Sequence, residues 1–341
     1  MRDRILDANF PRTADHRVYH LGLRAGEVAN RIITVGSASR AESIASYLDA
    51  SPKPFKLSSE RGFMTITGRF KGVPLSILSV GMGSPNVDFF IREVRECLSG
   101  DMIVIRLGSC GCLIDLPVGS IVIPKASVAV SRNYDFDFIS GSSQESPYRI
   151  SKPVSANEEL YLAVTKALNS VRPANSSTEI VSETVNASAD SFYSSQGRQT
   201  SFPDYNANLI ETLRSSVKGL ATLEMETFHI FHLAASWQGR GESAVVTSPP
   251  LATSPVLPEI QESPSTQKLP PGLSSLYEKP EIKAAAVHMV FASRSSQDFI
   301  APEQVAELEA WSGVGVLEAL RVFPIAPERL HPEPGSVWEI V

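Results

Sequence analysis

The stretch MIVIRLGSCG (102–111) decides the fold class. Residues 102–107 are apolar except for one side chain, which is typical of a strand buried on both faces of an α/β sheet. The small residues that follow let backbone N–H groups approach a ligand at the end of the strand. Arg106 interrupts the apolar run, and a buried guanidinium needs an anion. That anion is either an Asp or Glu side chain or a phosphate held bidentately, with Ser109 adding a hydroxyl.

Apolar runs and helical patterns alternate on both sides of this strand. Further strands are predicted at 31–36, 63–70, 73–80, 120–124 and 284–292. Helices are predicted at 40–48, 86–98, 158–168, 206–217, 225–237 and 303–322. This alternation predicts an α/β domain built around a sheet.

Proline marks the parts of the chain that do not fit the alternation. Residues 248–280 hold a third of the 24 prolines. Few apolar side chains there can be buried, so we expect a surface insert. An inert insertion is one interpretation, and a lid or a partner-binding segment is another. The tail from Pro324 is also rich in proline, which predicts an irregular end in which Trp338 can pack back on the domain.

Charge and cysteine content limit the class of protein. The chain of 341 residues has 31 Lys and Arg against 37 Asp and Glu, a net charge of -6, so bulk basicity offers no surface for nucleic acid. The N-terminus lacks an apolar signal region, and the stretch 284–292 is too short to span a bilayer. Three clustered cysteines fit reduced thiols. We expect a cytoplasmic protein without nucleic-acid or membrane partners.

Two further strands end in loops of small residues, VGSASR (35–40) and SVGMGSPN (79–86). A tight strand-to-helix turn explains the first loop by itself. Arg40 follows Gly36 by four residues, however, and the carboxyl ends of neighbouring strands meet at one edge of a sheet. The sequence therefore favours one anion site that takes Arg40 and Arg106 together.

The segment LEMET (223–227) places two carboxylates beside a methionine at the start of an apolar helix. Capping of the helix N-terminus explains one of them, and Glu224 is the candidate for that role or for a salt bridge. The pattern also suits a polyhydroxyl ligand, because a carboxylate accepts from vicinal hydroxyls while the Met225 thioether packs against a sugar. Glu226 is the candidate for the ligand contact.

Eight motifs in order resemble those of the uridine phosphorylases, in the nucleoside phosphorylase family. They are VYHLGL (18–23), VGSASR, SERGF (59–63), GMGSPN (81–86), RLGSCG (106–111), DSFYSSQGR (190–198), LEMET and HMVFASR (288–294). The resemblance implies a three-layer αβα sandwich around a mixed, partly barrel-like twisted sheet, in a single domain. That domain would span 18–325, interrupted by the insert at about 240–281, with an extension at 1–17 and a tail at 326–341.

The resemblance also implies the site residues. Phosphate would be bound by Gly36, Arg40, Arg61, Arg106 and Ser109, ribose by His20, Met225 and Glu226, and the base by Phe192, Gln196 and Arg198. His20 and Arg61 would act across an interface between subunits, in a dimer or hexamer. Arg106, Arg198 and Glu226 would be the catalytic residues, because they stabilise charge that develops in the transition state.

The implied reaction is reversible phosphorolysis of uridine to uracil and ribose 1-phosphate, a step of pyrimidine nucleoside salvage, with phosphate as co-substrate and no metal or organic cofactor. Ser194, Ser195 and Gly197 replace the Pro, Gly and Glu of the bacterial base loop, so deoxyuridine and thymidine stay open as substrates. The alternatives are a purine nucleoside phosphorylase, a nucleosidase and a non-catalytic nucleoside-binding protein. The stretch 293–294 lacks the Asp of purine enzymes, and the arginines argue against a nucleosidase.

Overall fold

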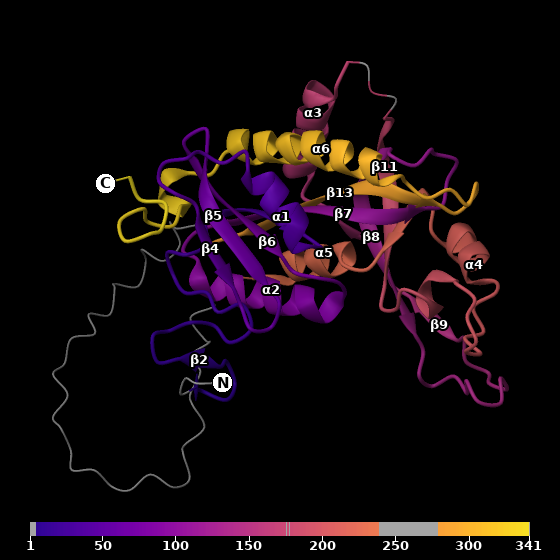
Figure 1. Cartoon of the computed structure of the whole chain (residues 1–341). Helices are drawn as coiled ribbons and strands as arrows, with labels where there is room; N and C mark the ends of the chain where they lie inside the picture. The colour runs from indigo at the N-terminus through magenta and orange to yellow at the C-terminus, as the bar shows by residue number, and fades with distance from the viewer. Residues whose placement is uncertain (1–4, 175, 177, 239–278, 341) are drawn as a thin grey trace, which may run out of the picture.

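A mixed sheet of eleven strands runs through the molecule and carries helices on both faces (Figure 1). The computed structural model describes residues 5–174, 176, 178–238 and 279–340. Most of the predicted insert at 240–281 lies outside the described residues. None of the described helices is long and apolar enough to cross a membrane.

One half of the sheet is an open, twisted array. Its strands are β4 (Phe55–Ser58), β5 (Met64–Phe70), β6 (Val73–Ser79), β3 (Arg31–Val35) and β7 (Met102–Cys112), in that spatial order. β3 pairs in parallel with both β6 and β7. The carboxyl ends of these three strands therefore lie together, as the loop sequences predict.

The other half closes on itself. β7 pairs with β13 (Ile282–Ser293), β13 with β8 (Ile121–Arg132), β8 with β11 (Ile180–Ala189), β11 with β12 (Leu220–Glu224), and β12 with β7. This ring of five strands confirms the predicted partly barrel-like sheet. The short strands β9 (Tyr148–Ile150) and β10 (Val154–Ser155) each pair antiparallel with β8. β1 (Ile5–Leu6) and β2 (Arg12–Thr13) form a separate two-stranded sheet.

Helices complete the outer layers. α1 (Ala38–Ala45), α3 (Glu158–Val171) and α6 (Pro302–Val322) pack on one face, and α2 (Ser84–Cys97) and α5 (Thr227–Ser236) pack on the other (Figure 1). α4 (Leu209–Ser216) covers the ring through Leu209 and Leu213. The predicted αβα sandwich is thus confirmed.

Local capping accounts for where the helices begin. Ser37 accepts from the backbone N–H of Arg40, so α1 starts at 38 rather than at the predicted 40. α4 starts at 209 rather than 206, because the Asn206 side chain is bonded to the loop before it. The sequence did not predict β11, since its segment IVSETVNASA is rich in polar residues. Of these polar residues, Asn186 and Ser188 are buried in the ring, where they hydrogen-bond one another and Glu224, whereas Glu183 is exposed and pairs with Lys125.

The C-terminal tail packs against the domain, as expected for Trp338. This side chain is 1% exposed, and its carbonyl accepts from Nε of Arg69 at 2.9 Å. A second anchor joins the guanidinium of Arg329 to Asp101 at 2.6 Å. The irregular tail is therefore part of the folded core.

Replacing Trp338 by Ala tests this packing. We expect Trp338→Ala to lower the free energy of unfolding by about 3–5 kcal/mol, because a large buried aromatic side chain is removed. Ile340→Ala is the matched control, since Ile340 is 68% exposed and should behave like the wild type. Urea denaturation measures both variants, and equal midpoints would show that the tail contributes nothing to stability.

Candidate active site

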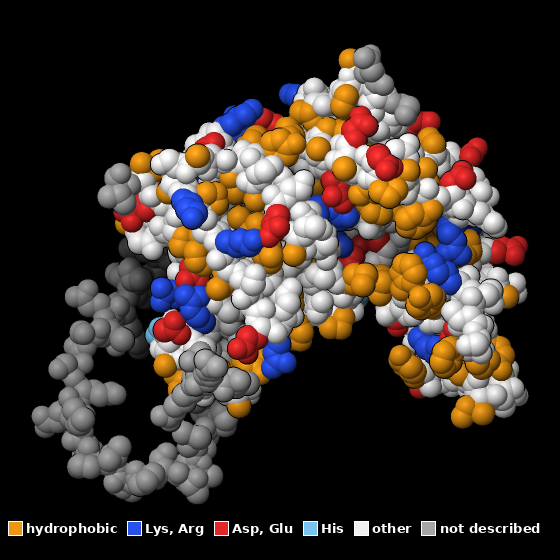
Figure 2. Space-filling model, viewed as in Figure 1, with side chains coloured by type: hydrophobic (Ala, Val, Ile, Leu, Met, Phe, Trp, Pro, Cys, Tyr) orange, Lys and Arg blue, Asp and Glu red, His pale blue; other side chains and the backbone are white. Residues whose placement is uncertain are grey.

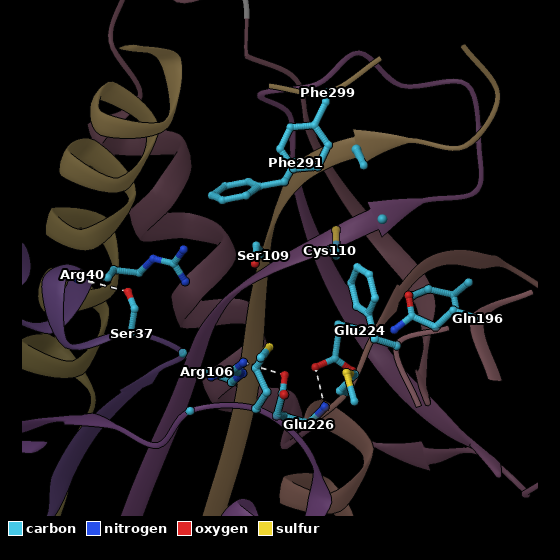
Figure 3. Close-up of a pocket in the computed structure, with 18 of the residues that line it drawn as sticks. Ser37, Arg40, Arg106, Ser109, Cys110, Gln196, Glu224, Glu226, Phe291 and Phe299 are labelled. Atoms are coloured by element: carbon cyan, nitrogen blue, oxygen red, sulfur yellow. Dashed lines mark hydrogen bonds and ion pairs between the residues drawn. The ribbon is translucent and has the colours of Figure 1, made fainter. Parts of the chain in front are cut away.

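A cavity of about 450 Å³ lies at the carboxyl ends of β3, β6, β7 and β12 (Figure 3). It collects residues that are far apart in the sequence. Among the predicted site residues it is lined by Gly36, Arg40, Arg106, Ser109, Phe192, Gln196, Arg198, Met225 and Glu226. The fold therefore places the predicted phosphate, ribose and base groups around one space.

Arg106 and Glu226 form a buried ion pair on the floor of the cavity. Nη2 of Arg106 lies 2.6 Å from Oε2 of Glu226, and each side chain is only 4% exposed. The other carboxylate oxygen, Oε1, accepts from the backbone N–H of Gly83 at 2.6 Å. The carboxylate partner that the sequence left open is thus the predicted ribose ligand itself.

The ion pair uses only part of the Arg106 guanidinium. Nε and Nη1 are buried, and neither has a hydrogen-bond partner among the described residues. Unsatisfied buried donors are rare in folded proteins and are expensive when no ligand completes them. These two nitrogens therefore fit an anion that enters the cavity, with Ser109 as a nearby hydroxyl (Figure 3).

Arg40 extends the positive side of the cavity. Arg40 is a residue of α1, and its Nε lies 2.7 Å from Oε1 of Glu309 on α6. Burial lowers the pKa of Arg40, the Glu309 carboxylate opposes this, and the charge of Arg106 lowers the pKa further. Two arginines, each joined to one carboxylate, therefore face the same region and repel one another until an anion joins them.

Glu226 is a carboxylate in a poorly solvated place. Burial raises its pKa, the nearby Arg106 lowers it, and the charge of Glu224 raises it. A carboxylate with this balance of effects accepts hydrogen bonds strongly while it stays ionised. Its position beside the Met225 side chain suits contact with sugar hydroxyls.

Glu224 has a structural role. Its Oε2 accepts from the backbone N–H groups of Glu226 and Thr227 at 2.8 and 2.9 Å, at the start of α5. Its Oε1 accepts from Nδ2 of Asn186 at 2.7 Å and from the Ser188 hydroxyl. The capping interpretation from the sequence is therefore confirmed for Glu224.

The base-binding candidates lie on the loop around the 3-10 helix η1 (Ser194–Gln196). The Arg198 guanidinium stacks over the Phe192 ring at 3.9 Å and donates to the Phe192 carbonyl at 2.7 Å. Its Nη1 also donates to Oε1 of Gln196. The Asn206 side chain holds the loop through the carbonyls of Ser194 and Arg198. The loop thus presents an aromatic face, an amide and a guanidinium together.

Several lining residues were not among the predicted site residues. Phe291 and Phe299 form an apolar wall, and Met82, which is 72% exposed, stands at the cavity's edge. Nη1 of Arg294 donates to the Gln196 carbonyl at 3.1 Å. Phe291 and Arg294 belong to the HMVFASR motif and Met82 to GMGSPN, so the motifs carried a signal for them. Phe299 had none.

His20 and Arg61 do not line the cavity of their own chain. His20 places Nδ1 2.6 Å from Oε1 of Glu93 and stacks on the Phe89 ring at 3.7 Å. Nη2 of Arg61 donates to the Tyr19 hydroxyl at 2.6 Å. Arg61 thus contacts Tyr19, the residue directly before His20 in the chain.

Fold and site together define a nucleoside phosphorylase architecture: a three-layer α/β sandwich with a cavity lined by arginines and glutamates at the ends of its strands. The chain belongs to the phosphorylase superfamily, whose sequence profile matches residues 30–238.

Individual relatives are similar over different shares of their length. The uridine phosphorylase of Thermococcus kodakarensis is 29% identical over 238 residues, covering 69% of this chain and 78% of that protein. A DeoD-type purine nucleoside phosphorylase of Oceanobacillus iheyensis is 29% identical over 114 residues, covering 33% of this chain and 47% of that protein.

Solved structures are similar to this chain as well. A structure from a study of two uridine phosphorylases of Phytophthora capsici is 35% identical, with a TM-score of 0.78, and covers 94% of this chain and all of that one. A Trypanosoma brucei nucleoside phosphorylase, 19% identical with a TM-score of 0.67 and coverage of 92% of this chain and 100% of that one, shares the fold.

The ion pair can be tested through stability alone. We expect Arg106→Met to lower the free energy of unfolding by about 3–5 kcal/mol at pH 8, because Glu226 is left as an unpaired buried charge. The double variant Arg106→Met/Glu226→Leu should regain much of this loss. Arg92→Met, which breaks the exposed pair with Asp88, is the matched control and should cost at most about 1 kcal/mol.

The loss of stability in Arg106→Met should depend on pH. Without Arg106, the pKa of Glu226 in the folded state lies further above its value in the unfolded chain, so the unfolded chain loses its proton first as the pH rises. Stability therefore falls with rising pH between those two values, and the Arg106→Met defect should be smaller at pH 5 than at pH 8. Urea denaturation at both pH values measures this, and a defect independent of pH would contradict it.

Proposed function

We propose that the protein is a uridine phosphorylase, a pentosyltransferase that converts uridine and phosphate reversibly into uracil and ribose 1-phosphate. The observation that carries the proposal is the Arg106 guanidinium, which holds Glu226 through one nitrogen and keeps two buried nitrogens without a partner in the described part of the chain. A dianion and a sugar can therefore bind side by side. The similar uridine phosphorylases support the choice of nucleoside.

The residues suggest how the reaction proceeds. Arg40 and Arg106 hold phosphate in one orientation below the anomeric carbon, with the Gly36 backbone and Ser109 adding contacts. Glu226 accepts from the ribose hydroxyls, and its charge favours the oxocarbenium character of the transition state. Phosphate attacks as the glycosidic bond to uracil breaks, with inversion and no covalent enzyme intermediate. The reaction requires no metal or organic cofactor.

The base loop stabilises the leaving group. Phe192 packs on the pyrimidine ring, while Gln196 matches a carbonyl next to an imide N–H because its amide both donates and accepts. Burial lowers the pKa of Arg198, and the neighbouring Arg294 charge lowers it further. A guanidinium in such a place favours negative charge on the uracil carbonyl as the base departs.

We further propose that a neighbouring subunit completes each site with His20 on the ribose 5-hydroxyl and Arg61 on the phosphate. Support comes from their position outside the cavity of their own chain. Large apolar side chains are also exposed, among them Tyr134 and Ile139 in the segment before β9, and Phe202. Figure 2 shows hydrophobic side chains on the surface of the lobe where Figure 1 labels β9. Exposed apolar side chains of this size are typical of surfaces that bind another protein.

We propose a cytoplasmic location, the compartment of pyrimidine nucleoside salvage. The three cysteines are free thiols, as is typical of a reducing compartment.

Uridine turnover with and without phosphate tests the proposed reaction. Purified protein should release uracil and ribose 1-phosphate only when phosphate is present, and Arg106→Ala should abolish this turnover because the anion loses its main ligand. Inosine is the matched competing substrate and should react more slowly. Release of uracil without phosphate indicates a nucleosidase, preference for inosine indicates a purine enzyme, and no turnover indicates a binding protein; each outcome contradicts the proposal.

Subunit mixing tests the shared site. Arg40→Ala lacks a residue of its own cavity, and His20→Ala/Arg61→Ala lacks the residues given to its neighbour, so each should be nearly inactive alone. After the two are unfolded and refolded together, mixed dimers hold one intact site, and about a quarter of wild-type activity should return. No recovery, or an active monomer by light scattering, would contradict the shared site.

A further inference from the structure

A chain of buried polar side chains crosses the interior of the five-strand ring. It comprises Asn186 and Ser188 on β11, Thr222 and Glu224 on β12, Thr227 on α5 and His288 on β13, all at most 5% exposed. Apolar side chains would fill such a core at a lower cost in free energy, because every buried polar group needs a hydrogen-bond partner. The reaction described above gives His288 no role.

His288 joins two hydroxyl groups. Its Nδ1 lies 3.1 Å from Oγ1 of Thr222, and its Nε2 lies 2.8 Å from Oγ1 of Thr227. Burial is the main cause that lowers the pKa of His288 to about 3; the Arg106 charge acts in the same direction and the Glu226 carboxylate opposes it. The imidazole is therefore neutral and carries a single N–H.

The neighbouring bonds fix which ring nitrogen carries that hydrogen. Nδ2 of Asn186 donates to the Glu224 carboxylate, so Oδ1 of Asn186 is the acceptor of its amide. Thr222 donates its hydroxyl hydrogen to this Oδ1 at 3.0 Å, and its oxygen must then accept from Nδ1–H of His288. Nε2 is left as an acceptor for the hydroxyl of Thr227. The bonds thus run in one direction, from Thr227 through His288 to Glu224.

Both ends of this chain lie at the first turn of α5. Thr227 donates at one end, while at the other end Glu224 accepts from the backbone N–H groups of Glu226 and Thr227. The hydroxyl of Ser188 accepts from the N–H of Phe228 at 2.8 Å. The backbone that carries the Glu226 carboxylate is therefore held from β11, β12 and β13 at once.

We propose that His288 is a positioning residue for Glu226: as a neutral Nδ1–H imidazole it holds Thr227, and thereby orients the Glu226 carboxylate toward Arg106 and the ribose. This inference rests on the proposed function for its kinetic consequence, whereas the direction of the hydrogen bonds does not depend on it. His288 is not among the residues that line the cavity.

Thr227→Val tests the proposal kinetically, because it keeps the shape of the side chain and removes only the hydroxyl that His288 accepts. We expect kcat/KM for uridine to fall about ten- to hundredfold, since small displacements of a substrate-binding group have effects of that size. KM for phosphate should change much less, because in the described structure the side chains of Arg40 and Arg106 bond Glu309 and Glu226 and make no hydrogen bond to His288. Thr227→Ser keeps the hydroxyl and should restore wild-type kinetics.

Thr184→Val is the matched control, since the Thr184 hydroxyl is buried on β11 and has no partner in the described structure. It should leave the kinetics unchanged. Equal kcat/KM for Thr227→Val and the wild type would overturn the proposal, as would equal losses in Thr227→Val and Thr184→Val.

Nitrogen-15 NMR of the histidine side chains supplies a readout without activity, with His288→Phe to identify the signal. The wild type should show a protonated Nδ1 and an unprotonated Nε2 from pH 5 to pH 8. A protonated Nε2, or titration within this range, would overturn the proposal. If wild-type protein fails to turn over uridine, the proposed function fails, and the NMR result alone decides the direction of the bonds.

Discussion

The buried ion pair between Arg106 and Glu226 is the constraint on which the rest of the site depends. Two ions are removed from water, one midway along β7 and the other at the start of α5, and neither would be stable there without the other. The pair also fixes geometry, because a guanidinium that is joined to a carboxylate through Nη2 directs its remaining nitrogens along a defined edge. Phosphate and sugar can therefore meet at adjacent faces of one charged group.

Neighbouring residues hold both members of this pair in place. Glu226 is held by Gly83 from the end of β6 and by the start of α5, whose N–H groups are capped by Glu224. The additional carboxylate raises the pKa of Glu226 and leaves the Arg106–Glu224–Glu226 group with a net negative charge. Arg40, paired with Glu309, lies close enough for its charge to interact with that of Arg106. The net charge of the protein is -6, so its overall charge does not attract an anion. The cavity suits an anion because Arg40 and Arg106 are among the residues that line it.

Much of this could be predicted from the sequence, and the limits have physical reasons. Apolar runs and capping residues mark the helices and the strands β3, β5, β6, β7, β8 and β13, and an arginine inside MIVIRL indicates a buried anion. Periodicity carries no information on contacts between residues 120 positions apart, so the identity of the Arg106 partner required the structure. β11 was not predicted because Asn186 and Ser188 find their hydrogen-bond partners inside the ring, a situation that composition does not reveal. His20 and Arg61 became site candidates only through resemblance, since a single chain places them outside the cavity.

The affinity for inorganic phosphate in the absence of nucleoside, measured by isothermal titration calorimetry, tests the central claim most directly. Arg106→Lys keeps the positive charge for Glu226 but replaces the fork of nitrogens by one ammonium group. If the two free nitrogens of Arg106 bind phosphate, the wild type binds it and the Lys variant binds at least about tenfold more weakly, equivalent to about 1.4 kcal/mol. Equal affinity of the two proteins would contradict the account, because a point charge beside Glu226 would then suffice.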